Sequence, residues 1–148
     1  MKHLATLLLL SVVFCFSCQY NSQSFDPTDG RLGGSWQLIE RGYSPGFGDV
    51  VEPVPLSPVQ RVSFHVDGTF TSNIDGLADF TYYRMVDDTA SQYPIVALFR
   101  SEPKSVDPSN LEHSYMVEFV DGKLKLSFRF CFEGCHMLFR SLNAQQVE

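Results

Sequence analysis

The sequence predicts an all-β fold, in which eight antiparallel strands close into an up-and-down barrel. Apolar residues alternate with polar ones in several segments, most clearly over 123–130, as expected of a strand with one buried face. Asp-Gly pairs at 67–68 and 121–122 favour the tight turns that join antiparallel strands. No apolar pattern with the period of an amphipathic helix persists for three turns in the domain. Barrel closure removes exposed sheet edges; a two-sheet sandwich is the alternative architecture.

The expected strands follow one another at short intervals, which favours antiparallel neighbours. In order, they cover residues 34–41, 61–66, 69–74, 78–86, 93–99, 115–119, 123–130 and 136–142. Between the first two, residues 42–58 hold three glycines and four prolines. Because glycine and proline interrupt strands and helices, this segment is predicted to be a long loop without regular structure.

The N-terminus has the layout of a signal peptide over residues 1–17. Lys2 gives a basic start, an apolar run follows, and Ser17 precedes Cys18. Cys18 resembles the acylated cysteine of bacterial lipoproteins, which implies lipid attachment at that residue in the cell envelope, on the periplasmic or outer surface. An ordinary secretory signal or an uncleaved anchor is the alternative. Residues 18–32 are polar and are expected to form a flexible tether, and residues 33–148 are expected to form the barrel domain.

The charge balance is acidic. The chain of 148 residues has seventeen acidic and eleven basic residues; one basic residue, Lys2, lies in the signal, which leaves ten basic residues and a net charge of −7. Nucleic-acid binding depends on neutralising phosphates, so an acidic domain without a basic cluster argues against a nucleic-acid partner. Anionic lipid headgroups would repel this domain mildly, so membrane attachment would come from acyl chains.

Only two cysteines, Cys131 and Cys135, fall in the predicted domain. In an oxidising envelope, two cysteines at this spacing across a tight turn can meet the geometry of a disulfide. We therefore expect a disulfide that clamps the last hairpin.

The domain resembles the lipocalin-like proteins, and in particular short lipocalin-like lipoproteins of bacterial envelopes. The motif Gly34-Ser35-Trp36 is similar to the Gly-x-Trp motif that opens the first barrel strand of that family, and Arg140 stands where its last strand carries an arginine. The resemblance implies a barrel closed at one end by Gly34, Trp36 and Arg140, with the guanidinium over the indole. It covers residues 33–142; the helix that larger lipocalins add after the barrel is not expected here, since six residues follow Leu142 in the sequence.

The resemblance also implies a ligand pocket at the open mouth of the barrel. An eight-stranded barrel can be filled by side chains or can hold one small ligand. Many bulky side chains point inward in the predicted strands, so a small cavity and a filled core both remain open. The residues expected to line a pocket are Tyr43, Phe47, Phe70, Tyr82, Tyr115 and Phe128. Apolar residues of the 42–58 loop form either a lid or contact surface at the mouth, or part of the core beneath it.

No motif in the sequence indicates catalysis. Neighbouring carboxylates at Asp87 and Asp88 point apart in a strand or turn, whereas acid–base chemistry needs convergent groups. Cys131, Cys135 and His136 are too few and wrongly spaced for a zinc or haem site. We therefore expect no catalytic residue, metal or cofactor.

The sequence thus predicts a membrane-anchored, extracytoplasmic barrel that binds a small hydrophobic molecule and is not an enzyme. The alternative is a solid barrel that binds another envelope protein through its mouth loops.

Overall fold

Nine β-strands form one antiparallel sheet in the computed structural model, which describes residues 31–46, 48–88, 91–131 and 134–142. The strands are β1 (Gly34–Tyr43), β2 (Val50–Pro53), β3 (Arg61–Phe64), β4 (Phe70–Ser72), β5 (Tyr82–Val86), β6 (Ile95–Phe99), β7 (Ser114–Val120), β8 (Lys123–Phe128) and β9 (His136–Ser141). Within the described ranges, no helix is long and apolar enough to cross a membrane. The predicted signal, Cys18 and the tether lie outside these ranges, apart from residues 31 and 32.

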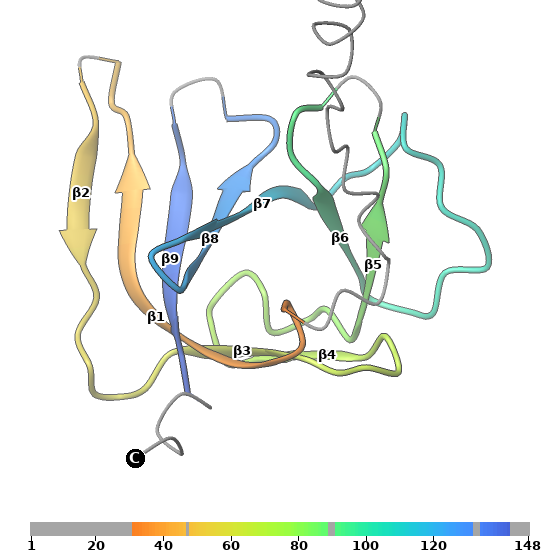
Figure 1. Ribbon diagram of the computed structural model, residues 1–148, viewed down its shortest axis with the longest axis horizontal. Helices are drawn as coiled ribbons and strands as arrows, with labels where there is room; N and C mark the ends of the chain where they lie inside the picture. The colour runs from red at the N-terminus through yellow and green to blue at the C-terminus, as the bar shows by residue number, and fades with distance from the viewer. Residues whose placement is uncertain (1–30, 47, 89–90, 132–133, 143–148) are drawn as a thin grey trace, which may run out of the picture.

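Eight of the strands curl into a nearly closed barrel in the order β4-β3-β1-β9-β8-β7-β6-β5 (Figure 1). The seam between β4 and β5 is held by a bridge between Thr69 and Tyr82. On either side of it, the Phe70 amide donates to the Thr81 carbonyl at 2.7 Å and the Tyr83 amide donates to the Gly68 carbonyl at 3.0 Å. The predicted all-β barrel is therefore confirmed, and the sandwich alternative is wrong.

Alternation along the strands sends one set of apolar side chains into the barrel. On β8, Leu124 and Leu126 are buried, while Lys123 is exposed and Lys125 lies on the outer face with it. The largest fully buried core side chains include Phe64, Phe70, Phe139 and Leu38. A second, smaller cluster of Val86, Ile95, Ala97 and Leu111 packs outside β5 and β6. The lower part of the barrel, which is the end formed by β3 and β4 at the bottom of Figure 1, is therefore filled by side chains.

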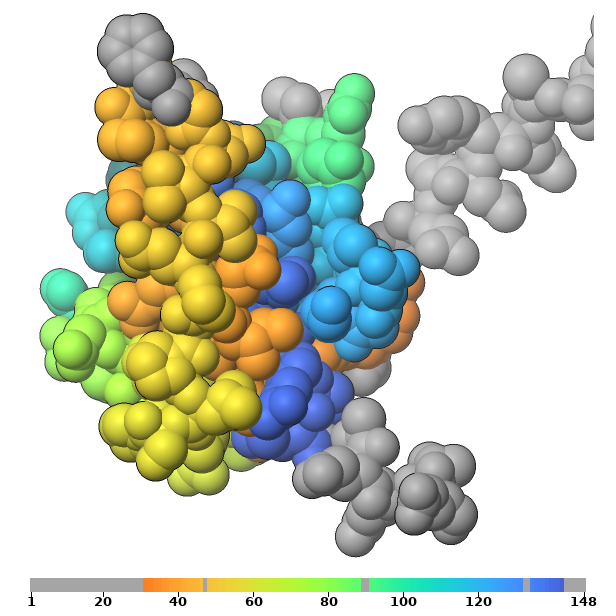
Figure 2. Space-filling view, turned by 90° about the vertical axis from the view of Figure 1, so that its left-hand side faces the viewer, coloured from red at the N-terminus to blue at the C-terminus, as the bar shows by residue number. Residues whose placement is uncertain are grey.

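The predicted loop at 42–58 contains a strand, which corrects the sequence analysis. β1 continues through Gly42 to Tyr43, and β2 then pairs with it from Tyr43↔Val50 to Glu40↔Pro53. The strand fits among the glycines and prolines of this segment because Pro53, which has no amide hydrogen to donate, is its last residue. Figure 2 shows the segment after β2 running down the outside of the barrel over β1.

Six of the predicted strands are shorter than expected, and in two of them a turn accounts for the difference. The strand predicted over 78–86 begins at Tyr82, because residues 74–80 form turns in which the Leu77 amide donates to the Ile74 carbonyl at 2.9 Å. The strand predicted over 123–130 ends at Phe128, because a turn follows in which the Cys131 amide donates to the Phe128 carbonyl at 3.2 Å. Phe130 was expected on the buried face but is 52% exposed.

A candidate ligand pocket at the barrel mouth

A pocket of about 340 Å³ opens at the end of the barrel where β1 and β8 finish and β9 begins, at the top of Figure 1. It is lined by Arg41, Gly42, Tyr43, Ile74, Asp75, Gly76, Leu77, Tyr115, Leu126, Phe128, Cys135, His136 and Met137. Its volume falls at the small end of the range typical of ligand sites, roughly 300–1,000 Å³. The barrel is thus filled below and hollow at its mouth.

A β-bulge in β1 brings Tyr43 to this pocket. Trp36 and Leu38 face the core, so strict alternation would send Tyr43 outward. The register with β9 shifts between Leu38 and Glu40, so that Arg41 lies opposite Met137, which packs against the core. Residues opposite one another share a face, and Tyr43, two residues on, therefore faces the pocket with Arg41.

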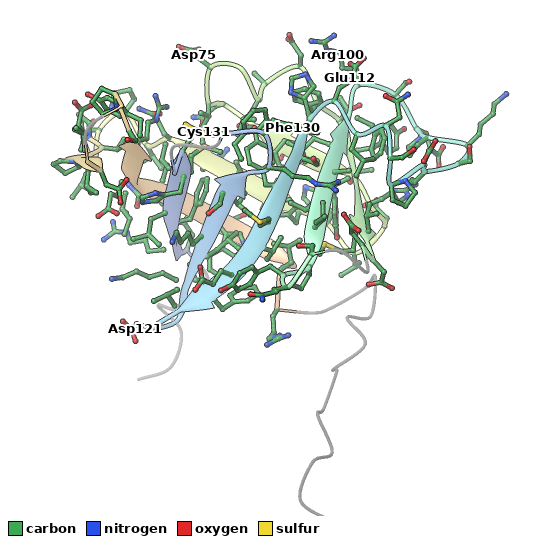
Figure 3. The ribbon with its side chains drawn as sticks, turned by 90° about the horizontal axis from the view of Figure 1, so that it is seen from above. Asp75, Arg100, Glu112, Asp121, Phe130 and Cys131 are labelled. Atoms are coloured by element: carbon green, nitrogen blue, oxygen red, sulfur yellow. A yellow bond between two sulfur atoms is a disulfide. The ribbon has the colours of Figure 1, made fainter. Side chains whose placement is uncertain are left out.

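One wall of the pocket is aromatic. Tyr115 on β7 lies opposite Phe128 on β8, with ring centroids 5.6 Å apart. The ring of Phe128 also contacts that of Phe130 at 6.0 Å, edge to face. Figure 3 shows Phe130 beside Cys131, at the end of β8 away from Asp121. Tyr115, Phe128 and Phe130 therefore form an aromatic row from the buried wall of the pocket to the surface.

The turn before β5 supplies an apolar wall on the other side. Ile74 and Leu77 are both buried and belong to the main core. The turn is fixed at its start, because the Ile74 amide donates to the Ser72 hydroxyl at 3.0 Å. Together with Leu126 and Met137, these side chains make the inner part of the pocket apolar.

Polar side chains at the rim are bonded to one another rather than left open. Arg41 Nη2 donates to Gln60 Oε1 at 2.8 Å, and the Tyr43 hydroxyl donates to Glu52 Oε1 at 3.0 Å. The hydrogen bond with the Glu52 carboxylate, and its negative charge, raise the pKa of Tyr43 above its usual value. His136 Nε2 lies 3.5 Å from Glu40 Oε1. The rim is therefore polar, and its side chains form hydrogen bonds with neighbouring residues.

The predicted disulfide between Cys131 and Cys135 is confirmed, with Cα atoms 5.6 Å apart, and it stands at the pocket mouth. The Phe128 amide donates to the Cys135 carbonyl at 2.9 Å, and the Cys135 amide donates to Cys131 Sγ at 3.2 Å. The disulfide thus holds the backbone that positions Phe128.

Removing the disulfide is expected to lower the free energy of unfolding by roughly 2 kcal/mol, because the closed loop of about five residues constrains the unfolded chain only modestly. The double change Cys131→Ser and Cys135→Ser should be measured by denaturant unfolding. The unmodified protein under a phosphine reductant serves as the control and should show the same loss. An unchanged midpoint in both would contradict a structural role for this disulfide.

Of the six predicted pocket residues, three are brought together and two are not. Tyr43, Tyr115 and Phe128 line the pocket, and Phe47 lies outside the described residues. Phe70 is buried in the core against Phe64, with ring centroids 5.1 Å apart. Tyr82 faces outward, since its neighbour Tyr83 is the buried core residue of β5. The predictions for Phe70 and Tyr82 as pocket residues are therefore wrong.

Several residues that line the pocket were not among those predicted from the sequence. Ile74 and Leu77 are apolar residues in an otherwise polar turn, which was a signal that the turn packs against something. On β9, Met137 lies two residues before the buried Phe139, so alternation places both side chains on the inner face. Arg41 reaches the pocket only through the bulge, and no local pattern announces it.

Gly34 and Trp36 lie in β1 near its start, at the end of the barrel opposite the pocket. Trp36 is buried, its Nε1 donates to the Leu32 carbonyl at 2.9 Å, and its ring lies 6.0 Å from Phe119. Gly34 has a φ of +121°, which side chains with a Cβ rarely adopt. The backbone conformation at residue 34 therefore favours glycine at this position.

Arg140 does not cover Trp36. Its Nε and Nη2 donate to Gln37 Oε1 at 3.0 and 2.8 Å, because Arg140 lies opposite Gln37 on the outer face of the sheet. Its neighbour Phe139 takes the inward position. The arginine that lies over an aromatic ring at this end is Arg31, whose guanidinium carbon is 5.4 Å from the Phe119 centroid. The predicted stacking of Arg140 on Trp36 is therefore wrong.

The neighbouring carboxylates Asp87 and Asp88 have different surroundings, and Asp87 is exposed. Asp88 is largely buried and forms an ion pair with Arg129, whose Nη1 also donates to the Pro108 carbonyl at 3.3 Å. Over the described ranges, no group of three or more His, Cys, Asp and Glu side chains is placed to hold a metal ion.

Comparison of the chain with protein-family models, with curated proteins and with solved structures finds no match.

Proposed function

We propose that this protein is a lipocalin-like lipoprotein of the bacterial cell envelope whose barrel mouth binds a small hydrophobic molecule. The observation that carries the proposal is the 340 Å³ pocket, which has apolar inner walls and a polar rim in an otherwise filled barrel. Ligand sites are typically concave and mostly apolar, with a few polar groups that orient the ligand. The sheet order and the Gly34-x-Trp36 start of β1 are further points of resemblance to lipocalin-like barrels.

Anchoring through Cys18 outside the cytoplasm is part of the same proposal. The disulfide between Cys131 and Cys135 supports an oxidising compartment, because structural disulfides are rare in the cytosol of most organisms. Lipid attachment is tested by mass spectrometry of the N-terminal fragment from cells. An acylated Cys18 is expected, whereas a free N-terminus at another residue would contradict the anchor.

The ligand is tested by native mass spectrometry of residues 26–148 recovered from an envelope extract. We expect a reproducible added mass of roughly a few hundred daltons, the size that a pocket of this volume admits, which leaves on denaturation. Met137→Trp should fill the pocket and abolish the added mass. Leu138→Trp adds the same ring at the outward-facing neighbour of Met137 on β9; it is the matched control and should retain the added mass. A bare mass from several extracts would overturn the proposal.

A second candidate function, binding of another envelope protein, is favoured by exposed apolar side chains along the β2 side of the barrel. Val51 belongs to β2, Leu56 and Val59 follow it before β3, and all three are exposed, Leu56 by 57%. Exposed apolar patches of this kind often mark protein interaction sites. Photo-crosslinking from position 56 in intact cells should capture one defined protein if this function holds. Crosslinks that vary between preparations would count against it.

A further inference from the structure

Tyr115 carries a hydroxyl group that has no hydrogen-bond partner in the described part of the chain. The side chain is only 7% exposed, and a buried tyrosine hydroxyl usually finds a partner. Tyr83, which is also 7% exposed, follows that rule, because its hydroxyl donates to the His65 carbonyl at 2.9 Å.

The free hydroxyl is accessible from the pocket rather than sealed in the core. Ser114 Oγ is the one side-chain polar atom of the described residues that is both fully buried and without a partner. The Tyr115 oxygen therefore keeps some contact with the outside, and Tyr115 lines the pocket wall. Burial raises the pKa of this phenol above its usual value, so the group stays a neutral hydrogen-bond donor at physiological pH.

Other polar side chains that line the pocket do not compete for this role. Arg41 and Tyr43 are exposed at the rim, and His136 lies beside Glu40 there. Asp75 is also exposed and can only accept when ionised, so none of these side chains is a buried donor as Tyr115 is. Around Tyr115, the wall consists of Leu126 and Phe128. A charged ligand group at this depth would lose its hydration without meeting an opposite charge.

We propose that the ligand is an uncharged, mostly apolar molecule with a carbonyl or hydroxyl oxygen at the end that enters first, and that the Tyr115 hydroxyl donates a hydrogen bond to this oxygen. The inference rests on the proposed ligand-binding function and adds the chemical class of the ligand. The apolar remainder of the molecule contacts Phe128, Leu77 and Met137, and the polar rim surrounds the end that stays in water.

The test uses two probes of nearly the same shape, 2-acetylnaphthalene and 2-isopropylnaphthalene, and titration calorimetry with the mature protein. Both should bind the unchanged protein. Tyr115→Phe keeps the ring and removes the oxygen, so it should weaken binding of the ketone about fivefold, the usual effect of one neutral hydrogen bond. Binding of the hydrocarbon should change less than about twofold, since its contacts with the ring remain. Tyr82→Phe removes a hydroxyl group from the outward-facing tyrosine of β5, which does not line the pocket; it is the matched control and should leave both affinities unchanged.

The possible outcomes separate the two proposals. If neither probe binds the unchanged protein, ligand binding in the mouth pocket and the Tyr115 inference both fail. If both probes bind and Tyr115→Phe affects them equally, or affects neither, the inference is overturned while the proposed function stands. Infrared spectroscopy of the carbonyl-labelled ketone bound to the unchanged protein needs no variant. A carbonyl stretch below its frequency in an alkane is expected, and an unshifted stretch would overturn the inference.

Discussion

Phe64→Ala is expected to lower the free energy of unfolding by about 3–5 kcal/mol, because it removes a fully buried ring from the filled part of the barrel. Phe64 is 1% exposed, and its ring lies 5.1 Å from those of both Phe70 and Tyr83. These neighbours belong to different strands and cannot collapse into the space without moving the sheet. Denaturant unfolding monitored by circular dichroism measures the loss.

Phe128→Ala is the matched comparison, since it makes the same chemical change in the wall of the pocket. Phe128 is only partly buried and already faces open space, so its loss removes contact area without creating a new cavity. We expect a cost of about 2 kcal/mol or less. Equal losses for Phe64→Ala and Phe128→Ala would mean that the mouth is packed as tightly as the lower barrel, and would contradict the pocket.

The strands that could be predicted from the sequence are those in which only one face is apolar. Along β8, lysine and leucine alternate, and the structure places every residue of that strand on the predicted face. On β5, Tyr82 and Tyr83 are both aromatic, so alternation alone does not say which one faces the core. The charge of Arg84 could have decided between them. A charged residue is expected on the outer face, and alternation then places Tyr82 on that face and Tyr83 in the core.

The pocket could be predicted only in part because its geometry depends on long-range events. The bulge at Ile39 reverses the parity of β1 and turns Tyr43 inward, but bulges leave no reliable signature in a single sequence. β2 was missed because its four residues stand among glycines and prolines, and only pairing with the far half of β1 makes it a strand. Tyr115 and Phe128 were found because both belong to regularly alternating strands.

Gly68→Ala is expected to destabilise the barrel by about 2–5 kcal/mol, because Gly68 stands at the seam where the sheet closes. Its φ of +83° lies in the left-handed region, where a Cβ costs about 1–2 kcal/mol. An added Cβ would also overlap the guanidinium of Arg84. Arg84 Nη1 donates to the Gly68 carbonyl at 3.1 Å and to the Tyr83 carbonyl at 2.8 Å, and its displacement would forfeit about 0.5–1.5 kcal/mol for each bond.

Gly76→Ala separates the two contributions to this cost. Gly76 has nearly the same φ, +81°, but nothing lies within 4 Å of the position that a Cβ would take. Its substitution should therefore cost only the backbone strain, about 1–2 kcal/mol. The double change Gly68→Ala with Arg84→Ala tests the remainder: once Arg84 is absent, adding the methyl group at residue 68 should cost no more than at residue 76. If Gly68→Ala cost the same with and without Arg84, the guanidinium would contribute nothing to closure, and the seam would be held by the Thr69–Tyr82 bridge and its two backbone hydrogen bonds alone.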